Sequence, residues 1–345
     1  MTLDPATPPP DTPPVPRGRG WGALATWDVA VIAVVIAVWI VAAVFVDNFA
    51  NARNLSFLLL DIAAIALIAM PMTLVIITGE IDLSVASILG LTSSVMGQLW
   101  FVGLPLETTI VLCVLLGAVL GALNGVFVTR FALPSLAVTI GTLAMFRGLA
   151  FVVLGDRAVA DFPFLWTGAV TSSIPGLPVP WVLVPLVLFA AVFGVVLHAT
   201  PVGRSLYAIG NSAEAARFSG VNIAATKFWL FVATGAMSSL AGIYWTLRFA
   251  SARADNAVGL ELSVVAAVLL GGVSIFGGKG ALPGVLAGVL LLGTLTNALQ
   301  LANVSADVLN VVTGLLLIVS VLAPNLLAAA RRAWARRSPP GQVPA

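Results

Sequence analysis

The sequence contains few of the side chains on which metal sites and enzymes depend. Among its 345 residues there is one cysteine, Cys113, and one histidine, His198. A single cysteine cannot form an internal disulfide, and zinc or haem sites need more cysteine and histidine ligands than this. His198 stands at the end of an apolar run without a plausible cysteine or serine partner. We therefore expect no catalytic residue, no metal site and no cofactor-binding site in this chain.

Charged residues are also scarce. They make up 9% of the chain, whereas soluble domains contain about 25%. The pI is about 9.1, but the basic residues lie at the ends of apolar segments, where membrane topology places them. These features exclude a soluble globular domain and argue against binding to nucleic acid.

Long apolar runs are what the sequence has in abundance. Hydrophobic residues make up 60% of the chain, and the mean hydropathy is +1.10. In a helix, about 20 apolar residues cross the roughly 30 Å hydrocarbon core of a bilayer while closing their own backbone hydrogen bonds. The sequence thus predicts an all-α, polytopic membrane bundle of about ten transmembrane helices. The predicted spans are 29–46, 55–78, 83–102, 109–128, 135–154, 180–197, 228–247, 262–276, 282–301 and 308–322.

The basic residues predict how this bundle is oriented. Ten spans place both termini on one side of the membrane, and basic residues are typically enriched in cytoplasmic connections. If the termini are cytoplasmic, eleven basic residues lie inside and four outside, namely Arg53, Arg157, Arg248 and Arg253, while Arg147 falls within a span. We therefore expect cytoplasmic termini.

Three regions follow from this pattern. Residues 1–26 are rich in proline and are expected to form a disordered cytoplasmic tail. Residues 27–325 form the predicted membrane domain, and residues 326–345 form a basic cytoplasmic tail on the lipid headgroups. Within the membrane domain, the connection 155–179 is predicted to be periplasmic and the connection 199–227 cytoplasmic.

Two carboxylates stand between the second and third predicted spans, where there is no real loop. Charges such as Glu80 and Asp82 are costly in this position unless they are solvated or paired. Asp82 or Ser84 could cap the next helix, with Gly79 allowing the turn. The alternative is a functional element that lines a pathway or contacts a partner, and the sequence leaves both interpretations open.

The cytoplasmic connection predicts a short helix that Ser212 can cap. Glu214 and Arg217 would lie three residues apart on one face of this helix, among small and aromatic residues. Such a surface suits docking into a groove of another protein. A helix lying on lipid headgroups is the alternative.

The glycine-rich segment 271–280 invites comparison with a phosphate-binding loop. That loop requires Ser or Thr after its Gly-Lys pair, between a strand and a helix. Here Gly280 follows Lys279 between two predicted spans. The segment therefore predicts a tight turn, and we expect no nucleotide site.

Polar residues in or beside the spans are candidates for lining a hydrophilic pathway, although hydrogen bonding between helices explains each one equally well. These pathway candidates are Asp61, Glu80, Asp82, Asn124, Arg147 and Asn297.

Three stretches resemble the ribose-type sugar permeases of bacterial ATP-binding-cassette (ABC) importers, a family that includes branched monosaccharide and autoinducer-2 permeases. The stretches are 79–87, 133–148 and 203–211 with 215–220. The resemblance covers nearly all of 54–325. It implies a multi-pass protein of the bacterial inner membrane that works by alternating access.

The resemblance also implies partners. These are a cytoplasmic ABC ATPase subunit that binds ATP, a periplasmic sugar-binding protein, a second permease (itself or a paralogue) and membrane lipid. The residues implied to couple the permease to the ATPase are Gly203, Arg204, Gly210, Asn211, Glu214, Ala216, Arg217 and Gly220.

Two departures bear on the substrate. The family commonly has glycine where this chain has Glu80 and Ala86. The sequence of 78–84 is more similar to that of permeases for rhamnose or autoinducer-2. We therefore expect rhamnose or a related monosaccharide as the substrate, with autoinducer-2 as the alternative. A carrier that works without ATP is a further alternative.

Overall fold

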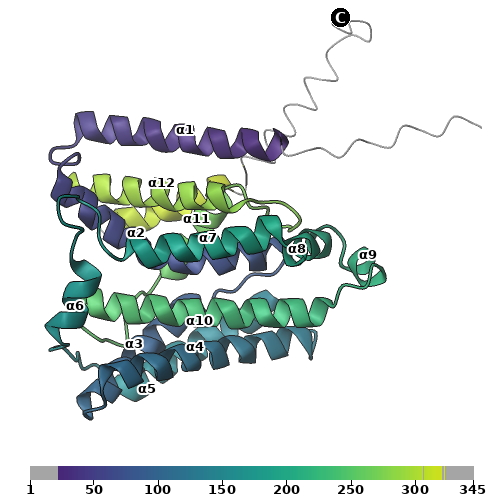
Figure 1. Cartoon of the computed structure of the whole chain (residues 1–345), viewed down its shortest axis with the longest axis horizontal. Coiled ribbons are helices and arrows are strands. Elements are labelled where there is room, and N and C mark those ends of the chain that lie inside the picture. Colours follow the sequence, from purple (N-terminus) through teal and green to yellow (C-terminus); the bar gives the residue numbers. More distant parts are fainter. Residues whose placement is uncertain (1–21, 306, 321, 323–345) are drawn as a thin grey trace, which may run out of the picture.

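A computed structural model describes residues 22–305, 307–320 and 322, and all regular elements in these ranges are helices (Figure 1). The helices are α1 Gly22–Phe45, α2 Ala52–Ile77, α3 Val85–Phe101, α4 Leu106–Thr129, α5 Ser135–Leu154, α6 Phe164–Thr171, α7 Leu183–Ala199, α8 Pro201–Asn211, α9 Ala213–Phe218, α10 Ile223–Phe249, α11 Leu260–Leu270 and α12 Leu282–Leu301. A further apolar helix covers Asp307–Ser320. Residues 22–26 of the predicted proline-rich tail are thus helical. Residues 1–21 and the basic tail, 326–345, lie outside the described residues.

An all-α polytopic membrane architecture is confirmed. Six helices are long and apolar enough to cross a membrane, namely α1, α2, α4, α5, α10 and α12. The pair α7 and α8 would add a seventh, bent by 66°. Each remaining predicted span contains a shorter apolar helix, α3, α11 or Asp307–Ser320. Helix α11 has only 11 residues, about 16 Å at 1.5 Å per residue, and the part of the predicted span 262–276 that follows Leu270 is not helical.

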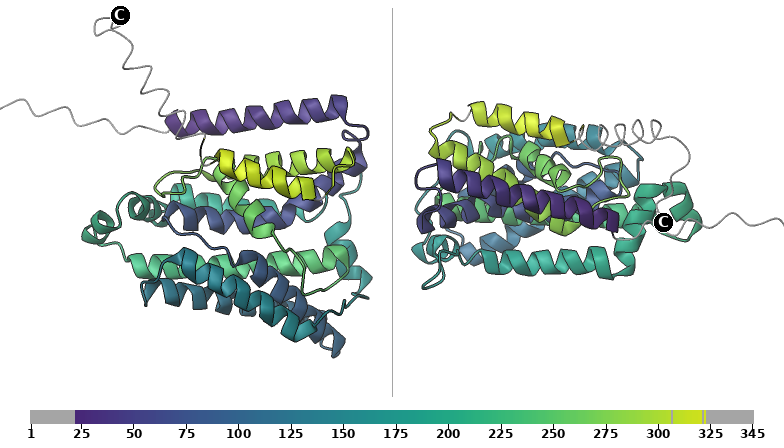
Figure 2. Two further views of the ribbon diagram at one scale, coloured as in Figure 1. Left: turned by 180° about the vertical axis from the view of Figure 1, so that it is seen from behind. Right: turned by 90° about the horizontal axis from the view of Figure 1, so that it is seen from above.

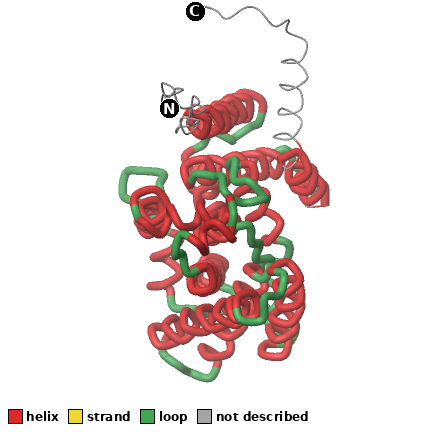
Figure 3. Tube along the Cα trace, turned by 90° about the vertical axis from the view of Figure 1, so that its right-hand side faces the viewer, coloured by secondary structure: helices red, strands yellow, loops and turns green. Residues whose placement is uncertain are grey.

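The long helices run side by side in layers (Figures 1 and 2). Helix α1 packs on α12, and α2 lies at the centre, in contact with α7, α10, α11 and α12. On the far side of α2, helix α10 packs on α3 and α4, and α5 packs on α3. Figure 3 shows the helices nearly end-on. Helices α8 and α9 lie at one end of the bundle and α6 at the other, and we name these the α8 end and the α6 end.

The contact between α4 and α10 depends on glycine. A Cβ atom at Gly117 would collide with the carbonyl of Gly235, and one at Gly121 would collide with the carbonyl of Phe231. Small residues allow helix backbones to approach closely in membranes, where van der Waals packing drives association. By contrast, a Cβ atom at Gly141 of α5 would meet open space.

This difference yields a prediction with a matched control. We expect Gly121→Val to force α4 and α10 apart and to lower the free energy of unfolding by about 1–3 kcal/mol, the usual cost of overpacking. Gly141→Val makes the same change in helix propensity at an exposed site. Thermal unfolding in detergent should show a lower midpoint for Gly121→Val alone. Equal midpoints for the two variants would contradict the packing described.

Candidate functional site

Four segments meet at the α8 end of the bundle. They are α8, the connection 78–84, the glycine-rich turn 271–281 and the start of α10. The amide of Gly278 donates to the carbonyl of Ile77 at 2.9 Å, and the hydroxyl of Tyr207 donates to the carbonyl of Gly280 at 2.7 Å. Gly210 lies directly on both Ile77 and Gly278, where a Cβ atom would overlap their backbones. Helix α8 is therefore docked on the ends of α2 and of the turn after α11.

An ion pair closes this docking region. The ammonium of Lys227 contacts the carboxylate of Glu80, and both side chains are more than four-fifths buried. Glu80, a charged residue between two apolar segments, is thus paired, as a charge in this position requires. Lys227 could not be picked out from the sequence, because nothing in the sequence links it to Glu80, which lies 147 residues earlier in the chain.

Asp82 is completely buried beside the start of α3. Its Oδ1 accepts from the amide of Ser84 at 2.9 Å and from the Ser84 hydroxyl at 2.6 Å. The side-chain amide of Asn124 donates to the same hydroxyl at 2.8 Å. Asp82 therefore binds an amide at the helix start, whereas Ser84, at the N-cap position, makes no capping bond. Among the described residues, no hydrogen-bond partner faces Asp82 Oδ2 or Asn124 Oδ1.

The predicted short helix is α9, and its predicted cap is confirmed. The hydroxyl of Ser212 accepts from the amide of Ala215 at 3.2 Å. Ala216 faces inward and is buried, whereas the ring of Phe218 is 85% exposed. Helix α9, which lies at the α8 end (Figure 1), thus carries an exposed apolar side chain, Phe218.

The structure distributes the coupling candidates over two places. Gly203 lies against the carbonyl of Leu197 and Gly210 against Ile77 and Gly278, while Asn211 is exposed but also lies next to Gly278. The others lie on or around α9 and on the exposed face of α8. Of these, Ala216 is buried, and the exposed residues are Arg204, Glu214, Arg217 and Gly220.

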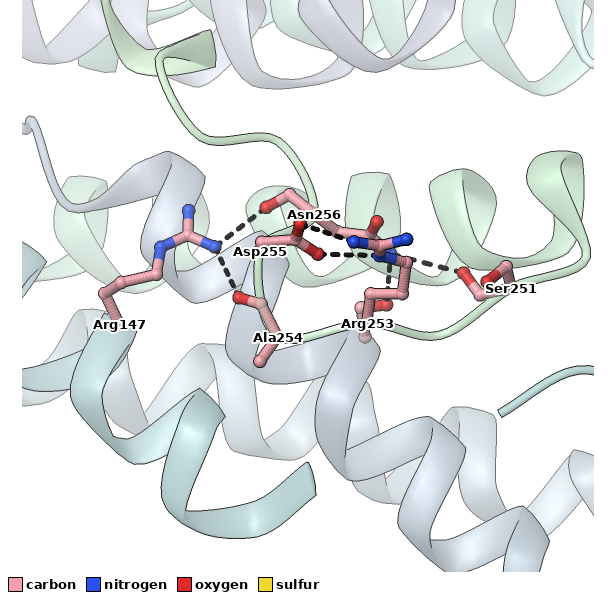
Figure 4. A network of polar contacts seen from close by, with 7 residues as sticks. Arg147, Ser251, Arg253, Ala254, Asp255 and Asn256 are labelled. Carbon is pink, nitrogen blue, oxygen red and sulfur yellow. Dashed lines mark hydrogen bonds and ion pairs between the residues drawn. The ribbon is translucent and has the colours of Figure 1, made fainter. Parts of the chain in front are cut away.

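Arg147 forms a second polar centre, inside the bundle (Figure 4). One guanidinium nitrogen donates to the carbonyls of Ala254 and Asn256, both at 2.8 Å. The other donates to the carbonyl of Ala86, in the first turn of α3, at 3.1 Å. In the same connection, Arg253 binds the carboxylate of Asp255 and holds the pKa of that group below its usual range. Sequence patterns could not reveal these acceptors of Arg147, because they are backbone atoms.

The two remaining pathway candidates each bind a neighbouring helix. Asp61 pairs with Arg248 of α10, and Asn297 exchanges hydrogen bonds with Asn54 at 2.8 and 3.1 Å. The six pathway candidates therefore do not form one site. Glu80, Asp82 and Asn124 gather towards the α8 end, whereas Asp61, Arg147 and Asn297 make separate contacts.

A bundle of long apolar helices with buried polar contacts between them is the architecture of a polytopic membrane protein. Residues 54–321 match the family described as branched-chain amino acid transport system / permease component. No solved structure matches the chain.

Similar proteins of known name agree with this class. Over 300 residues the chain is 35% identical to the ribose import permease protein RbsC of Haemophilus influenzae, covering 86% of this chain and 92% of the relative. Over 303 residues it is 31% identical to the autoinducer 2 import system permease protein LsrD of Salmonella paratyphi A, covering 86% and 91%. Over 302 residues it is 33% identical to LsrD of Escherichia coli O157:H7, covering 86% and 91%.

The chain therefore belongs to the branched-chain amino acid transport system / permease component family. The resemblance to sugar permeases of ABC importers is confirmed, and the protein is a multi-pass protein of the inner membrane.

The ion pair between Glu80 and Lys227 can be tested by a double-mutant cycle. Lys227→Met leaves the buried carboxylate of Glu80 without a partner, and we expect it to lower the free energy of unfolding by about 2 kcal/mol, between the values for exposed and buried pairs. Adding Glu80→Gln should recover most of this loss, as measured by thermal unfolding in detergent. Strictly additive effects of the two substitutions would show that the pair contributes nothing.

Proposed function

We propose that this chain is the permease subunit of an ABC importer and that α9 receives movement from a cytoplasmic ATPase subunit. The observation that carries the proposal is the combination of an exposed ring at Phe218 with the tight docking of Gly210. Helix α9 is short and water-facing, which suits binding in a groove of a partner. Names of the relatives, which are import permeases, support the same role.

The proposed mechanism passes through α8. Because Gly210 lies on Ile77 and Gly278, a displacement of α8 would act on the end of α2 and on the turn after α11 together. Rigid helices that repack between two discrete arrangements are the usual basis of such transitions. ATP closes the partner subunits, α8 and α9 follow, and the bundle opens alternately to each side. A second permease copy or paralogue completes the assembly.

The proposed topology has ten passages with both termini and the α8 end in the cytoplasm. Six full-length helices, α7 and the three shorter apolar helices would supply these passages. The non-helical segments before α3 and α11 would complete those two passages. The excess of basic residues in the connections assigned to the cytoplasm supports this orientation.

The proposed substrate is a small polyhydroxylated molecule that a periplasmic binding protein delivers. The names of the relatives point to ribose and to autoinducer-2. Rhamnose is supported only by the sequence of 78–84, so we rank it after ribose and autoinducer-2 as a proposed substrate. Catalytic chemistry is assigned to the ATPase subunit.

Coupling can be tested at the exposed aromatic ring. We expect Phe218→Ala to reach the membrane normally and to copurify roughly tenfold less of a co-expressed ATPase subunit, because exposed aromatic residues often dominate interfaces. Phe164→Ala is the matched control, since Phe164 is 87% exposed at the opposite end. Undiminished copurification with Phe218→Ala would remove α9 from the ATPase interface.

The substrate and the energy source can be tested together in proteoliposomes. The permease, its ATPase subunit and its binding protein should accumulate labelled ribose or autoinducer-2 only when ATP is supplied. Rhamnose should compete weakly or not at all. Accumulation driven by a proton or sodium gradient, without the ATPase subunit, would instead favour a secondary carrier.

A further inference from the structure

The connection between α10 and α11, residues 250–259, is partly buried in the bundle. Its side chains of Ala252 and Ala254 are buried, and it lies along small residues of α3. A Cβ atom at Gly97 would meet Ala252, and one at Gly90 would meet the carbonyl of Asn256. Gly90 and Gly97 are seven residues apart, so the segment follows α3 for about 10 Å.

Polar contacts hold this segment in place more than apolar packing does. Its buried side chains are three alanines, Ala252, Ala254 and Ala257, which bury little area. The amide groups of Ala252 and Val159 exchange backbone hydrogen bonds at 2.8 and 3.0 Å. Asn256 donates to the hydroxyl of Ser93 at 2.8 Å. Arg147 supplies the strongest contacts, because hydrogen bonds from a charged donor exceed neutral ones.

The backbone of the segment is strained at both ends. Ala250 has φ 46° and Ala257 has φ 58°, in the left-handed region that residues other than glycine seldom adopt. Gly259, at φ 85°, precedes α11. Such conformations persist only where the surroundings enforce them, and they concentrate at switch regions.

The other face of the segment borders a small cavity. It has a volume of about 170 Å³ and is lined by Phe151, Gly155, Asp156, Arg157, Arg253, Ala254 and Asp255. Arg147 contacts the carbonyl of Ala254 from within the bundle, while the side chains of Arg253 and Asp255 are about half exposed. The segment thus separates this cavity from the interior.

We propose that residues 250–259 are a gate at the α6 end of the transport pathway and that Arg147 is the positioning residue that latches it shut. Release of the Ala254 and Asn256 carbonyls lets the strained segment swing away from the small-residue face of α3. The gating role rests on the proposed transport function, whereas the latch itself is a property of the chain alone.

The latch can be tested by thiol accessibility, without a substrate or a partner. In a Cys113→Ala background, Ala254→Cys places a thiol at a site that is 2% exposed. A membrane-impermeant thiol reagent added on the α6 side should label it slowly when Arg147 is present. We expect labelling roughly tenfold faster or more in Arg147→Gln, since losing one charge-assisted hydrogen bond shifts an opening equilibrium by that factor. Arg147→Lys should fall between the two.

Two reporters separate local opening from general loosening. Thr171→Cys is exposed on α6 and should react at the same rate with and without Arg147. Ala64→Cys is fully buried in α2 and should stay unlabelled in both backgrounds. If Ala254→Cys reacted at the same rate with Arg147, Lys or Gln at position 147, Arg147 would not be a latch. The same would follow if Ala64→Cys also became labelled.

The gate can be tested by a reversible cross-link. Val159 and Ala252 form a hydrogen-bonded antiparallel pair, whose Cα atoms are typically about 5.5 Å apart, within the range of a disulfide. Oxidised Val159→Cys/Ala252→Cys should lose transport and regain it on reduction, whereas oxidation should not change transport by either single variant. Full transport by the cross-linked protein would overturn the gate. A wild-type protein that carries no substrate would overturn the proposed function, and labelling would still decide the latch.

Discussion

Hydrocarbon offers no hydrogen-bond partners, so every backbone amide and carbonyl inside the bundle must be satisfied by the chain itself. Helices do this automatically, but the segments before α3 and α11 are not helical. The first is held by side chains of α5, since Ser135 accepts from the amide of Ile81 at 3.2 Å and Thr139 donates to its carbonyl at 3.3 Å. The second is held largely by Arg147. Helix α5 therefore supplies the missing partners for both segments.

This arrangement connects the two ends of the molecule. Ile77 and Gly278, which lie under α8, stand just before the segment that leads into α3 and just after α11. Arg147 binds the first turn of α3 and the residues that precede α11. Helices α3 and α11 begin near similar sequences, Asp82-Leu-Ser-Val and Glu261-Leu-Ser-Val. The connection 78–84 and helix α11 thus run between the docking region and the Arg147 centre.

The sequence alone predicts the parts of this structure that depend on local composition. Apolar runs located the helices, and the cap of α9 followed from the serine at position 212. The predicted span 262–276 extends past the end of α11 at Leu270 because its later part includes Val273, Ile275 and Phe276, although the glycine-rich segment 271–280 also indicates a turn there. Composition could not pair Glu80 with Lys227 or give Arg147 its acceptors, since these contacts join distant segments and two of the three partners of Arg147 are carbonyls in one loop.

The acceptors of Arg147 have an evolutionary consequence. A carbonyl is present whatever residue occupies the position, so Arg253 and Asp255 are free to change while the closure they border is kept. Relatives could thereby vary the side chains that line this cavity without rebuilding the segment proposed to close it.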